Sequence, residues 1–301
     1  MLSDDLREEL AAIAPERDCD RLAELSGLFH VAGSAHLRGH GEVAVHLDLV
    51  SSGVARRAFA LLRAFDVESE IRTYRRAAFD QATRYQLHVA PSQTAYETLH
   101  RAGVLDAQHR PLDHPPRRVV ARRCCVGAYL RGALLGAGSL SGPRDAHLEI
   151  RAAEPEGARF LAELAERAGG HLSVQERARH ALAYAKGTEA IADVLVAAGA
   201  SDTMLALEEQ AVLAATRADA NRLANADHAN LVRTSRAAHA QLEAVRRLDL
   251  DRLPDDLREV ATLRLRHPTA SLAELGRRCR PAASKASVYR RLRRLQALSE
   301  T

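Results

Sequence analysis

The order of apolar and polar positions along the chain predicts two similar sets of helices and strands. A short helix at 4–14 leads into a second helix at about 21–32. In VAVHLDLV (43–50) valine or leucine recurs at every second position, which is typical of a half-buried strand, and Gly39 and Gly41 supply the turn before it. The remaining elements are an amphipathic helix at 52–65, strands at about 67–75 and 83–90, and a helix at 91–105 that Ser92 can cap.

The same order then returns. Residues 106–118 contain three prolines and no periodicity, which predicts a linker. After it come a helix ending near Gly136, strands near 139–141 and 146–151, a helix at 155–167, strands near 171–175 and 179–184, and a helix at 187–198. The order α-β-β-α-β-β-α, written twice, predicts two half-domains packed as a pseudo-dimer.

Beyond Gly199 the strand patterns stop. Residues 201–248 are predicted to form connecting helices, and prolines separate three further helices at 255–266, 271–278 and 284–297. The predicted fold is therefore α+β, followed by an all-α domain. The predicted parts are 1–105, 106–118, 119–200, 201–248 and 249–301.

One small-residue helix is written twice, as ELSGLFHVAGS (24–34) and YLRGALLGAGS (129–139). A glycine inside a helix costs about 1 kcal/mol relative to alanine, so repeated glycines need a reason. Close contact between the backbones of two paired helices is that reason. The predicted interface glycines are Gly27, Gly33, Gly132, Gly136 and Gly138.

These two stretches resemble the LAGLIDADG motif of homing endonucleases, in which paired helices join two α-β-β-α-β-β-α halves. In active members, an acidic residue before the last glycine of each motif binds the catalytic metal. Here those positions hold Ala32 and Ala137. A methyl group cannot coordinate Mg²⁺, which requires oxygen ligands, so we expect no catalytic residue and no metal-assisted cleavage.

The C-terminal stretch SLAELGRRCRPAASKASVYRRLRRL (271–295) has the form of a helix-turn-helix. Ser271 and Ser284 can each cap a helix, and Val288, Leu292 and Leu295 form one buried stripe. In this motif the N-terminal part of the second helix enters the major groove of DNA. The predicted DNA-binding residues are Ser284, Lys285, Ser287, Tyr289, Arg290, Arg291, Arg293 and Arg294.

Charge distribution supports an anionic partner for this segment. The net charge of the chain is only +4, yet residues 277–294 hold eight arginines or lysines and no acid. The simplest partner is double-stranded DNA, although a charge run can also be a solvated surface. A second basic face is an alternative to ordinary solvated surface at 115–123 and on the sheet positions Arg72, Tyr74, Arg76, Arg84, Gln86 and His88.

Composition excludes several classes of protein. With 301 residues, 47% of them hydrophobic, no tryptophan, no run of 18 apolar residues and an acidic amphipathic N-terminus, the chain predicts a folded cytoplasmic protein without a membrane span or signal peptide. We expect no cofactor and no metal. His30, His36, His40 and His46 lack a cysteine or carboxylate at ligand spacing, and the repeat-equivalent Cys19 and Cys124 favour packing over redox sensing.

The whole chain resembles the WhiA family of sporulation and cell-division regulators. The matching stretches are 123–150, 184–200, 221–234 and 253–295. The resemblance implies a degenerate LAGLIDADG-type domain and a C-terminal helix-turn-helix, hence a nucleoid-associated transcription regulator that is not an enzyme. It also implies a WhiB-like iron–sulfur partner. Where the family has an Asn-His pair this chain has Tyr289-Arg290, so its preferred DNA sequence is open.

Two other functions remain open at this point. An active LAGLIDADG-type endonuclease requires acids that both motifs lack. Alternatively, the N-terminal domain is a protein-interaction module in cell division.

Overall fold

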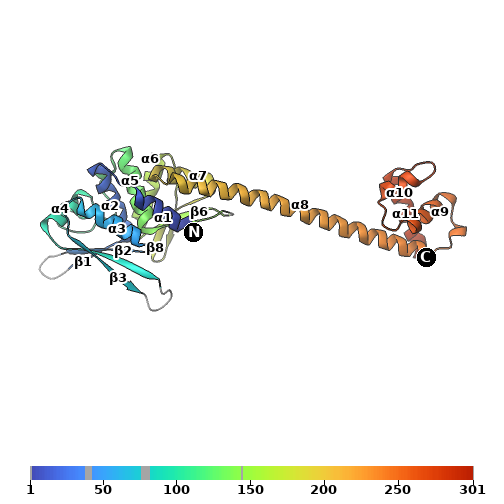
Figure 1. Ribbon diagram of the computed structural model, residues 1–301, viewed down its shortest axis with the longest axis horizontal. Coiled ribbons are helices and arrows are strands. Elements are labelled where there is room, and N and C mark those ends of the chain that lie inside the picture. Colours follow the sequence, from blue (N-terminus) through green and yellow to red (C-terminus); the bar gives the residue numbers. More distant parts are fainter. Residues whose placement is uncertain (1, 38–42, 76–81, 144, 301) are drawn as a thin grey trace. The chain divides into compact units, whose positions relative to one another are not determined.

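The structure, a computed structural model, describes residues 2–37, 43–75, 82–143 and 145–300 (Figure 1). Contacts divide the chain into an N-terminal unit, Met1–Ala215, and a C-terminal unit, Thr216–Thr301. Each unit encloses a hydrophobic core of its own.

The first half of the N-terminal unit follows the predicted order. Its elements are α1 (Leu2–Ala12), α2 (Asp18–Ala32), β1 (Gly33–Leu37), β2 (Val43–Leu49), α3 (Ser52–Arg63), β3 (Ser69–Arg75), β4 (Thr83–Val89) and α4 (Gln93–Arg101). The four strands form an antiparallel sheet in the order β1-β2-β4-β3. The alternating residues of β2 bury Val45 and Leu47 beneath the helices, as their period of two predicts.

The second half repeats this arrangement. It contains α5 (Arg123–Ala137), β5 (Gly138–Ser141), β6 (His147–Ala152), α6 (Pro155–Ala168), β7 (Ser173–Arg177), β8 (His180–Lys186) and α7 (Thr188–Ala198). Its sheet has the order β5-β6-β8-β7, the same topology as the first. The α+β fold predicted from the duplicated pattern is confirmed.

Strand β1 is the element that the pattern did not predict. It begins at Gly33, directly after α2, and pairs antiparallel with β2 from Gly33↔Leu47 to Leu37↔Val43. Its first three residues are Gly, Ser and Ala, which carry little strand propensity, so cross-strand pairing rather than local preference forms it. The turn predicted at Gly39 and Gly41 lies outside the described residues.

The two motif helices, α2 and α5, pack directly against each other in the middle of the unit (Figure 1). A Cβ atom on Gly27 would lie 2.2 Å from the carbonyl oxygen of Tyr129, and one on Gly132 would lie 2.1 Å from the carbonyl oxygen of Glu24. A Cβ on Gly136 would lie 2.6 Å from a methyl group of Val31. These three glycines therefore allow the two helices to approach at backbone distance.

Gly33 and Gly138 have a different role from the one expected. The atoms nearest to a Cβ at these positions belong to each glycine's own helix, with the carbonyl oxygens of Phe29 and Leu134 at 2.3 and 2.4 Å. Each glycine has extended backbone angles and donates its N–H to that same carbonyl. They terminate α2 and α5 and start the following strands, and they do not provide the close contact between the helices.

A buried ion triad crosses the same junction. The carboxylate of Glu24, which is fully buried, accepts hydrogen bonds from Arg57 of α3 (2.7 and 3.0 Å) and from Arg131 of α5 (2.8 Å). Arg131 also donates to the carbonyl oxygen of Ala198 at 3.3 Å. A buried carboxylate requires such partners, because desolvation of an unpaired charge costs several kcal/mol. No local pattern in the sequence predicts this triad.

The predicted linker is folded onto the N-terminal unit. The carboxylate of Asp106 accepts from the backbone N–H groups of Gln108 and Arg110, both at 2.8 Å. Residues 117–120 form a 3₁₀ turn, Arg117–Val120, whose two valines are buried. Gly103 precedes it with φ +69°, and a Cβ there would lie 2.6 Å from Pro116. The segment therefore has a fixed path between the halves.

The connecting segment is one helix, α8 (Ser201–Arg246), rather than several. Its start belongs to the N-terminal unit, where the Glu9 carboxylate accepts the N–H groups of Asp202 and Thr203 at 2.8 Å. Its end belongs to the C-terminal unit, whose core contains Val245. The contacts thus divide the chain within α8, between Ala215 and Thr216.

Three helices complete the C-terminal unit: α9 (Asp255–Arg266), α10 (Leu272–Arg278) and α11 (Lys285–Ser299), preceded by a 3₁₀ turn at Leu250–Arg252. Within the described part of the chain, no helix has the length and apolar character needed to cross a membrane.

Candidate nucleic-acid interface

Helices α10 and α11 form the predicted helix-turn-helix, and serine hydroxyls cap both. Ser271 Oγ accepts the N–H of Glu274, and Ser284 Oγ accepts the N–H of Ser287, each at 3.2 Å. The apolar stripe of α11 is completely buried: Val288, Leu292 and Leu295 have no exposed surface. Burial of this stripe orients the opposite side of α11 toward solvent.

The turn between α10 and α11 is tight because Gly276 has no side chain. The carbonyl oxygen of Ala283 would lie 2.2 Å from a Cβ at Gly276, and the N–H of Ala283 donates to the carbonyl oxygen of Gly276 at 2.9 Å. Any larger residue would force the two helices apart. This contact fixes how α11 projects from the unit.

Arg264 of α9 anchors the rest of the unit, a role that was not predicted from the sequence. Its guanidinium, 2% exposed, donates to the carbonyl oxygen of Ala270 at 2.7 Å and to Gln241 Oε1 of α8 at 2.9 Å. Burial lowers the pKa of this arginine. A signal was available: position 264 continues the buried spacing of Leu257, Val260 and Ala261, where a charged residue needs internal partners.

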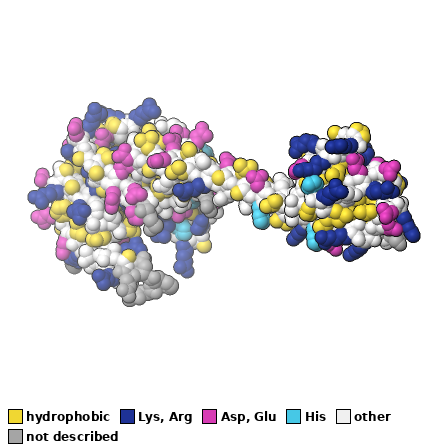
Figure 2. Space-filling view, turned by 45° about the vertical axis from the view of Figure 1, so that its right-hand side comes forward, with side chains coloured by type: hydrophobic (Ala, Val, Ile, Leu, Met, Phe, Trp, Pro, Cys, Tyr) yellow, Lys and Arg dark blue, Asp and Glu magenta, His cyan; other side chains and the backbone are white. Residues whose placement is uncertain are grey.

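Most of the predicted DNA-binding side chains lie on the exposed surface of α11. Lys285, Arg290, Arg293 and Arg294 are exposed, and half of the surface of Tyr289 is accessible. Arg290 and Arg293, three residues apart, project opposite the buried stripe. Figure 2 shows Lys and Arg side chains on the visible face of the C-terminal unit.

Two predicted contact residues have internal partners. The Ser284 hydroxyl is committed as an acceptor to its capping bond, although its own proton is free to be donated. The Arg291 guanidinium lies 3.5 Å from the Asp256 carboxylate of α9, and the Arg291 side chain is 27% exposed. Ser287 is half-buried at the first turn. The predicted contact residues whose side chains are exposed and have none of these internal partners are Lys285, Tyr289, Arg290, Arg293 and Arg294.

In the N-terminal unit, Ala32 and Ala137 are the last residues of α2 and α5, as the motif requires. Both present a methyl group at the ends of the paired helices. Among the described residues, one group of three or more potential metal ligands comes together, and it lies at the opposite ends of these helices, around Cys19.

The outer face of the first sheet has mixed charge. Tyr74 and Gln86 both donate to the Asp48 carboxylate, at 3.1 and 3.0 Å, and Arg72 donates to Glu70 at 2.8 Å. The carboxylates thus occupy donors that a phosphate would need. Of the other positions considered for a basic face, Arg84 and His88 lie on β4, and Arg76 lies outside the described residues.

The four histidines considered for metal binding do not form one site among the described residues. The rings of His36 and His46 stack on the outer sheet face with centroids 5.0 Å apart. His30 lies on α2, where its Nδ1–H donates to the Ser26 carbonyl at 2.7 Å and burial lowers its pKa to about 4. His40 lies outside the described residues.

Three family models match the chain in the order of its parts. The WhiA N-terminal LAGLIDADG-like domain matches residues 18–105, the WhiA LAGLIDADG-like domain matches 126–217, and the WhiA C-terminal HTH domain matches 220–299. A relative from Heliobacterium modesticaldum, named probable cell division protein WhiA, is 37% identical over 98% of this chain and 94% of its own. The chain belongs to the WhiA family.

A second relative of the same name, from Symbiobacterium thermophilum, is 35% identical over 98% of this chain and 96% of its own. The crystal structure of full-length DUF199/WhiA from Thermatoga maritima aligns over 99% of this chain and 97% of its own, with a TM-score of 0.58 and 22% identity. That likeness shows a shared WhiA fold. The family predicted from the motifs is therefore confirmed, with its two LAGLIDADG-like halves and its C-terminal helix-turn-helix.

Proposed function

We propose that this protein is a sequence-specific regulator of transcription that binds double-stranded DNA and acts in cell division and sporulation. The observation that carries the proposal is the exposed basic surface of α11, held by a helix-turn-helix whose turn and caps are fully formed. The names of the relatives support the cell-division setting.

In this proposal the two ends of α11 have different roles. Lys285 and Tyr289 lie in its first turns, where a helix-turn-helix meets base edges in the major groove. Arg293 and Arg294 lie further along and contact phosphates, which positions the helix without reading sequence. Arg290 lies between these two groups along α11 and can contact either a base edge or a phosphate.

Salt titrations of DNA binding test these roles. Each protein is titrated on its operator duplex, identified by selection from random sequence, and on a scrambled duplex. Tyr289→Ala should weaken operator binding alone, by about 1–3 kcal/mol for each lost base contact. Arg293→Ala with Arg294→Ala should weaken binding to both duplexes and reduce the salt slope by roughly 2, one for each phosphate contact.

Arg252→Ala is the matched control. Arg252 is an exposed arginine of the same unit that lies outside α10 and α11, in an ion pair with Asp249. Its removal should leave both affinities and the slope unchanged. If the α11 variants behave like this control, DNA is bound elsewhere on the protein and the proposal fails.

We further propose that the LAGLIDADG-like part does not cut DNA. Ala32 and Ala137 offer no oxygen to a divalent metal where the motif needs one at each helix end. Purified protein incubated with varied duplexes and Mg²⁺ or Mn²⁺ should leave them intact. Cleavage that copurifies with the protein through several columns, and is lost in a Gly132→Val variant that separates α2 from α5, would establish the endonuclease instead.

A further inference from the structure

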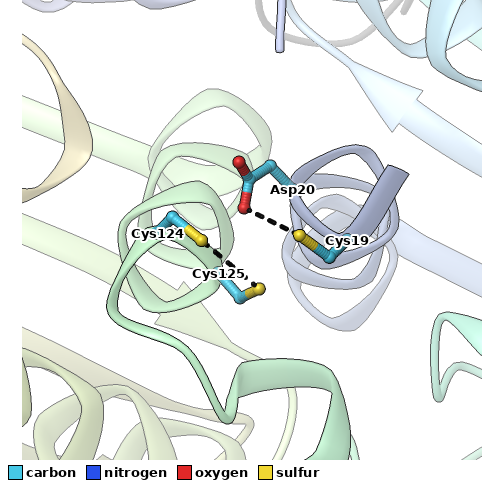
Figure 3. Close-up of side chains that lie close together, drawn as sticks. All are labelled: Cys19, Asp20, Cys124 and Cys125. Atoms are coloured by element: carbon cyan, nitrogen blue, oxygen red, sulfur yellow. Dashed lines mark hydrogen bonds between the residues drawn. The ribbon is translucent and has the colours of Figure 1, made fainter. Parts of the chain in front are cut away.

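Three thiols and a carboxylate converge where α2 and α5 begin. Cys19 and Asp20 come from the first turn of α2, and Cys124 and Cys125 come from the first turn of α5 (Figure 3). One potential ligand atom from each residue lies within 4.8 Å of all the others. The pairs are equivalent in the internal repeat, because Cys19 corresponds to Cys124 and Asp20 to Cys125.

The separations are close to those of a tetrahedral zinc site. Zinc–sulfur bonds of about 2.3 Å and zinc–oxygen bonds of about 2.0 Å place two sulfurs about 3.8 Å apart and a sulfur and an oxygen about 3.5 Å apart. The Sγ atoms of Cys124 and Cys125 are 3.9 Å apart, and the Cys19 Sγ lies 3.5 Å from Asp20 Oδ1. The remaining sulfur–sulfur pairs need to close by about 1.0 Å at most and the remaining sulfur–oxygen pairs by about 1.3 Å at most, which rotations of the side chains provide.

We propose that Cys19, Asp20, Cys124 and Cys125 bind one Zn²⁺ ion that joins the two LAGLIDADG-like halves. On binding, each thiol loses its proton to solvent and coordinates as a thiolate. All four positions are filled by protein, so the site is structural and leaves no position for a substrate. The proposal replaces our expectation from the sequence that the chain holds no metal.

The ligand types favour zinc over other metals. Three thiolates exclude Mg²⁺ and Ca²⁺, which prefer oxygen ligands, whereas the carboxylate is a poor ligand for Cu⁺. Iron–sulfur clusters ordinarily require four thiolates, or two thiolates and two histidines. Zn²⁺ accepts sulfur and carboxylate oxygen together in tetrahedral geometry.

The surroundings favour an anionic site. Three thiolates and one carboxylate exceed the charge of Zn²⁺, and the N-terminal ends of α2 and α5 both place positive dipole ends there. The residues before these helices, Arg17 and Arg122, provide no side-chain cap. The Arg122 guanidinium instead lies 4.0 Å from Cys19 Sγ, where it offsets negative charge on the sulfur.

The ligands are also accessible to an incoming ion. Cys19 and Cys124 are half-buried rather than enclosed, and Cys19 lines a surface pocket with Leu22, His100 and Arg118. Zinc can therefore enter the folded protein. Once bound, the ion joins the first turns of α2 and α5, which lie more than a hundred positions apart along the chain.

Cobalt substitution tests the proposal on the full chain, purified under reducing conditions and freed of metal with a chelator. Titration with Co²⁺ should give one equivalent bound, thiolate-to-cobalt charge-transfer absorption and the intense visible bands of tetrahedral Co²⁺. Zn²⁺ should displace it and raise the thermal midpoint of the N-terminal unit. Loss of second-sphere groups already costs 10–100-fold in affinity, so Cys19→Ser or Cys124→Ser should weaken Zn²⁺ binding by more than about 100-fold.

Two further variants keep the test decisive. Asp20→Asn retains all three thiols, so it should keep the charge-transfer band while weakening Zn²⁺ binding, with unchanged far-ultraviolet circular dichroism. Cys279→Ala removes the fourth cysteine, which is buried in the C-terminal unit, and should bind zinc like the unaltered chain.

The proposal is overturned if Co²⁺ produces no thiolate band, or if the band persists unchanged in Cys19→Ser and Cys124→Ser. It is also overturned if the reduced protein binds no metal and the protein prepared without reductant contains a disulfide from Cys19 to Cys124 or Cys125. That outcome would make the cluster a redox pair.

Discussion

Replacing Glu24 by glutamine should strongly destabilise the N-terminal unit. Glu24→Gln keeps the size of the side chain but removes the charge that pairs with two guanidinium groups. Both groups are largely buried: the side chains of Arg57 and Arg131 are 8% and 10% exposed. In the variant, the two guanidinium groups would have one uncharged acceptor, the amide oxygen of the glutamine, in place of a carboxylate.

The magnitude follows from measured losses in other proteins. Breaking a buried ion pair by removing one partner costs about 3–5 kcal/mol. For a unit of this size, 1 kcal/mol shifts the melting midpoint by about 2–4 °C, so the N-terminal transition should fall by roughly 6–20 °C. Differential scanning calorimetry of the full chain measures this directly, because the two units have separate cores.

Glu70→Gln is the matched control, because Glu70 pairs with Arg72 on the outer sheet face where both side chains are exposed. Ion pairs on the surface contribute little to the free energy of unfolding, so the melting midpoint of Glu70→Gln should equal that of the unaltered chain. A combined Glu24→Leu, Arg57→Met and Arg131→Met variant should recover most of the loss, since an apolar replacement leaves no charge unpaired. If the melting midpoint of Glu24→Gln equals that of Glu70→Gln, the triad does not stabilise the junction and the reasoning is refuted.

Three other predictions concern separate parts of the chain. Gly132→Ala should lower the melting midpoint of the N-terminal unit although alanine has the better helix propensity, because the new Cβ would lie 2.1 Å from the Glu24 carbonyl oxygen. Gly157→Ala is the control: the nearest atom to its Cβ would lie at 3.4 Å, so the midpoint should not fall. Arg264→Met should destabilise the C-terminal unit by about 1–3 kcal/mol in urea denaturation, since buried acceptors lose their donor; unchanged stability would contradict the anchoring role. Burial lowers the pKa of His30 to about 4, below its unfolded value of about 6.5. The free energy of unfolding is therefore highest above pH 6.5 and decreases as the pH falls toward 4, by about 2 kcal/mol at pH 5. His30→Gln should flatten this part of the stability profile, and an unaltered slope would show that another group titrates.

The elements that the sequence predicted well are those whose periodicity is local. Helix α9 occupies the predicted range 255–266, and Ser92, Ser271 and Ser284 cap helices as expected, because capping depends on residues two or three positions apart. Strand β1 was missed because its pairing with β2, and not its own residues, determines it.

The site was predicted only in part for a similar reason. The exposed basic surface of α11 follows from its buried stripe, which is a local pattern. The contacts Glu24–Arg131 and Cys19–Cys125 depend on how closely α2 and α5 pack, and residues more than a hundred positions apart give no periodic signal of that distance. The repeat gave one usable clue, since it made Cys19 and Cys124 equivalent, but only the packing of the helices shows that equivalent residues meet.

The buried triad also determines which helix can pair with which. In the internal repeat, Glu24 corresponds to Tyr129, and Arg131 corresponds to Ser26. If two copies of α2 paired with each other, each would bury Glu24 opposite a serine, with the arginine of α5 missing. If two copies of α5 paired, Arg131 would face a tyrosine ring in place of a carboxylate. Divergence between the two copies has thus made pairing of like halves unfavourable, so that the first half is complementary to the second half and not to itself.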